Sequence, residues 1–246
     1  MSYQFDTILG AGRDGSVSLA EQQKGFDAGT AAQKAAFQAS VSGDVLNFSA
    51  LASIISPTPG QRARVVAPVM SGGLPYTNWF YDGAVWRLAG VQDLFVDASP
   101  SVGIASTAEQ ILKQVTVDPG VLLALRYFTI RTVVAKSGIT DAMSVFRIRC
   151  GANGTISDLT LLADTALTAA NRQRANELPL FATSPTVVRH YTNGFGGGTA
   201  QSLTSQAYPA QATVASMLSA VKISFSAQMA GTTDTPVAAS VIISGA

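Results

Sequence analysis

The stretch Met143-Ser-Val-Phe-Arg-Ile-Arg-Cys150 alternates apolar and polar side chains with a period of two. Such alternation is typical of a strand with one face on the core and the other in water. Phe146, Ile148 and Cys150 would share one face, with Val145, Arg147 and Arg149 on the other. Val221-Lys-Ile-Ser-Phe-Ser226 repeats the pattern, with Val221, Ile223 and Phe225 on one side. Both stretches therefore predict β-strands.

Around these two stretches the chain from about residue 104 is a series of β-type runs separated by turn residues. Little helical pattern lies between them, so we expect an antiparallel two-sheet β-sandwich of jelly-roll type, whose strand order the sequence does not give. The eight predicted strands lie near Gln110–Val117, Leu125–Ala135, Met143–Cys150, Thr155–Leu162, Thr165–Asn171, Thr186–Tyr191, Met217–Gln228 and Val237–Ile243.

The N-terminal part has a different texture. Thr30-Ala-Ala-Gln33 has capping-box spacing and opens an Ala-rich run to Val41, which predicts a short helix, and Ser18-Leu-Ala-Glu21 allows a second helical turn. Asp82-Gly83 between aromatic-rich runs predicts a β-hairpin. We expect an N-terminal anchoring region over 1–58, a small β-hairpin segment over 59–98 and the sandwich over 99–246.

Charged residues make up only 13% of the chain, against roughly 25% in an average soluble domain. Surface that is neither charged nor inside the subunit is either rich in small polar side chains or covered by a partner. We therefore expect the chain to assemble with its own copies. A net charge of +1 provides no field to attract nucleic acid or an anionic membrane.

Two absences narrow the function classes further. Cys150 is the only cysteine, so an intrachain disulfide and a cysteine-based zinc site are excluded. No run resembles a secretory signal or is long enough to span a membrane as a helix.

Two sets of motifs resemble a known class of proteins. Gly60-Gln-Arg-Ala-Arg-Val-Val66 and Trp79-Phe-Tyr-Asp-Gly-Ala-Val-Trp-Arg-Leu-Ala-Gly90 look like the displayed hairpin of bacteriophage virion appendage proteins of the tail-fibre, head-fibre and decoration type. The runs that resemble the jelly-roll domain attached to that hairpin are Ser106–Val117, Leu125–Arg131 and Phe146–Gly151.

This resemblance implies a virion structural protein, made in the host bacterial cytoplasm. Such proteins are commonly homotrimers. Residues 1–60 would then dock to other virion proteins, and the sandwich would face outward. The resemblance does not give the position on the particle.

No motif gathers a catalytic site. His190 is the only histidine and lies in a strand-like run, and no nucleophile elbow is present. The Gly-rich stretch Asn193–Thr199 lacks the third glycine of a dinucleotide fingerprint and the Lys of a phosphate-binding loop. We expect no enzyme activity, no cofactor and no metal site.

Two alternatives concern the surface. Exposed aromatic rings could stack on a sugar, which makes a carbohydrate-binding module for a host-surface glycan the second hypothesis; the candidate rings are Trp79, Trp86, Tyr191 and Phe195. Four arginines could form a basic stripe, which we interpret as a solvated or intersubunit sheet face rather than a nucleic-acid site; they are Arg126, Arg131, Arg147 and Arg149.

Overall fold

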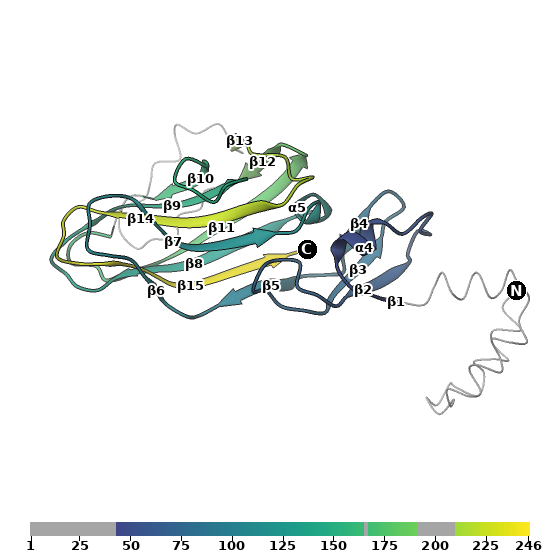
Figure 1. The fold of residues 1–246 in the computed structure, drawn as a ribbon, viewed down its shortest axis with the longest axis horizontal. Coiled ribbons are helices and arrows are strands. Elements are labelled where there is room, and N and C mark those ends of the chain that lie inside the picture. Colours follow the sequence, from purple (N-terminus) through teal and green to yellow (C-terminus); the bar gives the residue numbers. More distant parts are fainter. Residues whose placement is uncertain (1–42, 165–166, 191–209) are drawn as a thin grey trace, which may run out of the picture.

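The structure, a computed structural model, describes residues 43–164, 167–190 and 210–246. These residues are mainly β-strand, so the predicted fold class is confirmed. The short helices expected over 18–24 and 30–41 lie outside the described residues. The described part is an elongated body with a small sheet at one end and a two-layered sandwich along the rest of its length (Figure 1).

The small sheet has the strand order β1-β2-β3-β4 and carries one short helix. Its elements are β1 (Gly43–Val45), α4 (Phe48–Ala52), β2 (Arg62–Val65), β3 (Thr77–Tyr81) and β4 (Trp86–Leu88). Asn47 caps the start of helix α4, and its side chain accepts a hydrogen bond from the Ala50 amide at 2.9 Å. Its buried Phe48 ring lies 4.8 Å from the Trp79 ring. The chain from Gly43 therefore belongs to the small sheet, which corrects the expected boundary at 58.

The Asp82-Gly83 hairpin is confirmed. Tyr81 pairs with Trp86 across the turn, and Gly83 has a φ of 102°, where a side chain would be strained. The Asp82 carboxylate accepts hydrogen bonds from the Val85 and Ala84 amides and from Arg87, and these lower its pKa to about 2. The acidic residue thus closes the turn, as its position in the sequence indicates.

Eight strands form the sandwich, and their order is that of a jelly roll. They are β5 (Gln92–Asp97), β7 (Gln110–Val117), β8 (Phe128–Lys136), β9 (Met143–Gly151), β10 (Leu159–Asp164), β11 (Gln173–Ser184), β14 (Val221–Met229) and β15 (Pro236–Gly245). The smaller sheet of the sandwich has the order β10-β9-β14-β7, and the larger sheet of the sandwich contains β11-β8-β15-β5. Numbered one to eight along the chain, the strands therefore read 2-7-4-5 and 1-8-3-6.

Three short strands extend the larger sheet: β12 (Val187–His190) and β13 (Ala210–Thr213) beyond β11, and β6 (Ser101–Val102) beside β15. Strand β5 pairs with β15, so the sandwich begins at Gln92 and not at residue 99. Strand β11 was not predicted, because Pro179 and the charged Arg174 and Glu177 interrupt its apolar pattern. The strand expected over Thr165–Asn171 is wrong where it is described, since only Leu167 forms an isolated bridge there.

One continuous hydrophobic core joins the small sheet to the sandwich. The segment after β2 bonds to β7 and to the residue that follows it: the Ser71 amide donates to the Thr116 carbonyl at 2.8 Å, and the Asp118 amide donates to the Val69 carbonyl at 3.0 Å. Arg87 of β4 donates to the Leu123 carbonyl of α5 (Val121–Ala124) at 3.2 Å. Because these contacts cross between the units, the small sheet is held against one end of the sandwich.

We expect Trp79→Ala to destabilise the protein by about 3–5 kcal/mol, because it leaves a cavity beside Phe48 and removes the indole N–H that bonds to Thr77. Chemical denaturation followed by circular dichroism measures the change. Val85→Ala is the control, since Val85 is exposed in the same hairpin and should change stability little. Equal unfolding midpoints for the two variants would contradict the assigned role of Trp79.

Candidate self-assembly interface

The two tryptophans proposed as stacking faces lie in the core. Trp79 is fully buried, and its indole N–H donates to the Thr77 hydroxyl at 2.9 Å. Trp86 is also buried, with its ring 5.7 Å from that of Tyr81. The structure therefore does not place either ring where a sugar could stack on it. Tyr191 and Phe195 lie outside the described residues.

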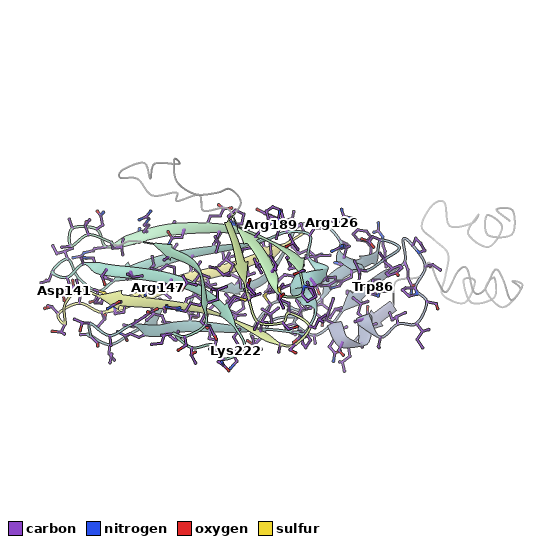
Figure 2. All side chains as sticks on the ribbon, turned by 90° about the horizontal axis from the view of Figure 1, so that it is seen from above. Trp86, Arg126, Asp141, Arg147, Arg189 and Lys222 are labelled. Carbon is purple, nitrogen blue, oxygen red and sulfur yellow. The ribbon has the colours of Figure 1, made fainter. Side chains whose placement is uncertain are left out.

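The predicted arginine stripe is wrong, because the four side chains lie in three different places. Arg131 is on the larger sheet, and Arg126 lies 5.9 Å from the Phe80 ring at the end nearest the small sheet. Arg147 and Arg149 are on β9 of the smaller sheet. Figure 2 shows Arg126 and Arg147 in separate parts of the body. Sequence periodicity placed Phe146, Ile148 and Cys150 on the buried side of β9 correctly, but it could not assign the strands to sheets.

Arg147 and Arg149 both bind one carboxylate. Glu109 accepts from Arg147 at 2.6 Å, from Arg149 at 2.8 Å and from the Ser226 hydroxyl at 2.6 Å. Arg149 is only 7% exposed and also donates to the Asp158 carbonyl at 2.8 Å. This cluster fixes the segment before β7 across the outer side of the smaller sheet. The side of β9 that was expected to face water is therefore covered there.

Burial raises the pKa of Glu109, but the hydrogen bonds from Ser226 and Arg149 and the charges of the two arginines outweigh burial and hold it below its usual value. The carboxylate is therefore charged at neutral pH.

Other ionisable groups of the described residues also hold backbone in place. Asp141 and Asp234 lie on the loops that follow β8 and β14, and each carboxylate accepts hydrogen bonds from two amides of the other loop. The amides of Asp234 and Thr233 lower the pKa of Asp141. Burial, followed by the charge of Asp158, raises the pKa of the Cys150 thiol to about 12. That thiol stays protonated and is a poor nucleophile.

Among the described residues no group of three or more His, Cys, Asp or Glu side chains could hold a metal ion. Within the same residues, no helix is long and apolar enough to cross a membrane.

The surface that stands out is the outer face of the larger sheet, defined as the side that points away from the sandwich core. On β8 the side chains of Ile130, Thr132 and Val134 are buried, so Arg131 and Val133 point outward. Outward side chains on neighbouring strands follow from the register. The aliphatic ones are Val96 on β5, Val102 on β6, Ala135 on β8, Ala175 on β11, and Val237 and Ile242 on β15. The polar ones include Asp93 on β5, Thr129 on β8, Gln173 and Glu177 on β11, and Ser240 and Ser244 on β15.

The charged side chains named on the outer face are Arg131, Asp93 and Glu177. Arg131 donates to the Ser244 hydroxyl at 2.9 Å and lies 3.3 Å from the Asp93 carboxylate on β5. Its side chain therefore leans toward the Ser244 end of the strands. On the other side of Arg131, a shallow hollow of about 180 Å³ lies over β8, β11 and β15. Two small side chains, Ser240 and Ala175, lie on either side of Val133 in the register and leave this space open.

A face of this kind can bind an apolar partner. Large apolar areas on a protein surface mark contact sites, and a hollow lined by aliphatic atoms accepts an aliphatic side chain. The sequence could not reveal this face, because it is built from β5, β8, β11 and β15, which are far apart in the chain.

In comparisons with known proteins, no family model matches the chain, and no curated protein matches it.

We expect Glu109→Gln to lower stability at pH 7 by roughly 3 kcal/mol, because it leaves two arginines, one of them buried, without their counter-charge. The folded pKa of Glu109 is lowered, so its contribution is present above the unfolded pKa and is lost as the pH falls. The difference from the wild type should therefore shrink between about pH 5 and pH 2. Denaturation curves at a series of pH values measure it.

Asp44→Asn is the matched control. Asp44 also pairs with an arginine, Arg64, at 2.7 Å, but both side chains are about half exposed. Such pairs contribute little. If both variants lost equal stability at pH 7, the Glu109 cluster would not be the support described above.

Proposed function

We propose that this chain is a non-enzymatic structural subunit of a bacteriophage particle, of the fibre, decoration or tail type, that assembles with its own copies. The observation that carries the proposal is the set of aliphatic side chains on the outer face of the larger sheet. Burying this face against a copy would remove the exposed Val96 and Val102 and the half-buried Ile242 from water, and each fully buried aliphatic side chain contributes about 1.5–3 kcal/mol.

Few charged side chains lie among the outward residues named above. Arg131 is paired with Asp93, and Glu177 lies opposite Arg131 in the register. The low charge of the whole chain, 13%, agrees with a protein that covers part of its surface in an assembly.

The shape of the body supports docking through the N-terminal part. Figure 2 shows Asp141 at one end and Trp86, in the small sheet, at the other. The chain enters the described part at β1, which lies at the edge of the small sheet. If residues 1–60 bind other virion proteins, the loops around Asp141 and Asp234 face away from the particle. The hydrogen bonds between these two loops would keep that tip rigid.

We do not propose a carbohydrate-binding site on the described residues. Both tryptophans that suggested one are covered by other side chains. The self-assembly proposal needs neither ring.

We expect the full chain at micromolar concentration to show a native mass three times the 25.4 kDa of one chain. The contact is apolar, so the assembly should persist when sodium chloride is raised from 0.05 M to 1 M, whereas an ionic contact would weaken. Light scattering coupled to size-exclusion chromatography gives the mass. A folded single chain at both salt concentrations would overturn the proposal.

A further inference from the structure

The small sheet has a second face, opposite to the one that packs on α4. Along β2 and β3 the side chains of Ala63, Val65 and Trp79 are buried, so the residues that alternate with them point to the opposite face. We name this the Phe80 face, after its central ring. It consists of Asp44 on β1, Arg62 and Arg64 on β2, Asn78 and Phe80 on β3, and Arg87 on β4, which lie opposite one another in the register.

Two arginines of the Phe80 face already have a carboxylate partner. Arg64 pairs with Asp44 at 2.7 Å, and Arg87 pairs with Asp82 at 3.0 Å. Arg87 also donates to the Leu123 carbonyl of α5. Because their positive charges are matched within the chain, these two arginines do not call for an external anion.

Two further arginines flank the Phe80 ring with no carboxylate beside them. Arg62 lies directly opposite Phe80 in the register, and the guanidinium carbon of Arg126 lies 5.9 Å from the centre of the ring. Figure 2 shows Arg126 toward the end of the body where the small sheet lies. Both arginines are exposed, and within the described part of the chain neither side chain forms a salt bridge or a hydrogen bond. The surface around Phe80 therefore carries two positive charges without a counter-charge.

A second aromatic ring is displayed beside these arginines. Tyr76 is 56% exposed, and its φ of 63° lies in the left-handed region that side chains other than glycine rarely adopt. The guanidinium carbon of Arg64 lies 5.4 Å from the centre of the Tyr76 ring. Arginine and tyrosine are among the residues that contribute most to binding at protein contacts. The composition of this surface is therefore that of a contact site.

We propose that the Phe80 face, together with Arg126, binds an acidic segment of another protein. The inference goes beyond the proposed function, because it concerns a different surface and a partner that is not a copy of this chain. Carboxylates of the segment would pair with Arg62 and Arg126, since a guanidinium can donate two parallel hydrogen bonds to one carboxylate. The methylene groups of a glutamate would pack on the half-buried Phe80 between them.

A nucleic acid fits this face less well than an acidic polypeptide. Base stacking needs an open ring, and the Arg126 guanidinium already lies over Phe80. Asp44 and Asp82 would repel a phosphate backbone laid along the paired arginines. A polypeptide can place neutral side chains or backbone amides against these two carboxylates. Two free positive charges therefore favour a short acidic segment over a long polyanion.

The test titrates the full chain into a fluorescently labelled hexaglutamate peptide and follows the anisotropy of the label. We expect saturable binding whose dissociation constant rises roughly tenfold when sodium chloride is raised from about 0.02 M to about 0.3 M. Arg62→Glu and Arg126→Glu should each raise the dissociation constant at low salt roughly fivefold or more, because each replaces an attraction with a repulsion. Circular dichroism must show that the variants fold. Should Arg126→Glu fail to fold, Arg126→Gln takes its place, with an expected rise of roughly threefold.

Arg172→Glu is the matched control. Arg172 is exposed like Arg62, and its carbonyl accepts from the Lys136 amide at the end of β8, so it lies far from the small sheet. This variant changes the net charge of the chain by the same amount and should leave peptide binding unchanged. If Arg172→Glu weakened binding as much as Arg62→Glu, the attraction would belong to the whole chain and the proposal would be wrong. Absence of peptide binding at low salt would overturn it as well.

Two further measurements distinguish the other occupants. A labelled hexathymidylate that bound more tightly than hexaglutamate would make the Phe80 face a nucleic-acid site and overturn the proposal. Native mass is the second measurement: if Arg62→Glu or Arg126→Glu dissociated a wild-type assembly, the face would be a contact between copies, and an external partner would be excluded. Weakened peptide binding with an unchanged native mass supports the inference, whether the wild type is an assembly or a single chain.

Discussion

The fold depends on the insertion of the last strand, β15, between the first and third strands of the jelly roll. Pairing of β15 with β5 and β8 joins residues more than a hundred positions apart, so the larger sheet closes only when the C-terminal residues arrive. Such long-range pairing costs loop-closure entropy, which burial of Val241 and Ile243 on the core side must offset. The same strand places Ser240 and Ile242 on the outer face. The same strand therefore contributes to both the core and the candidate interface.

Polar interactions hold the parts of the described body together. Glu109 binds two arginines on β9 of the sandwich. Arg87 of β4 donates to carbonyls of α5, and Asp141 joins two loops at the opposite end of the body. In each case a charged group satisfies hydrogen-bonding groups of the backbone or of arginine that would otherwise lose water on folding. These contacts join the small sheet to one end of the sandwich and the two loops at the other end.

The successes and failures of sequence reasoning have a common physical origin. Gln110–Val117 and the Asp82-Gly83 hairpin were predicted correctly, because alternation and turn chemistry are local. Strand β11 was missed, because Pro179, which lacks an amide proton, and two charged residues hide its alternation of Asn176, Leu178 and Leu180. The tryptophans of the hairpin were taken for exposed rings, because the sequence does not show that α4 and the rest of the core cover them. The outer face of the larger sheet was not predicted, since it combines strands from the beginning and the end of the sandwich sequence, β5 and β15.

The sequence by itself determined that the chain is rich in β-strand, poor in charge and punctuated by turns, since these properties follow from side-chain type and short-range backbone preference. It also determined which side of several strands is apolar. Only the tertiary structure decided the order of the strands, the burial of Trp79 and Trp86, the pairing of Arg147 and Arg149 with Glu109, and the composition of the outer face of the larger sheet. These features arise between residues distant in the chain, where the free energy of packing selects one arrangement among many with the same local pattern.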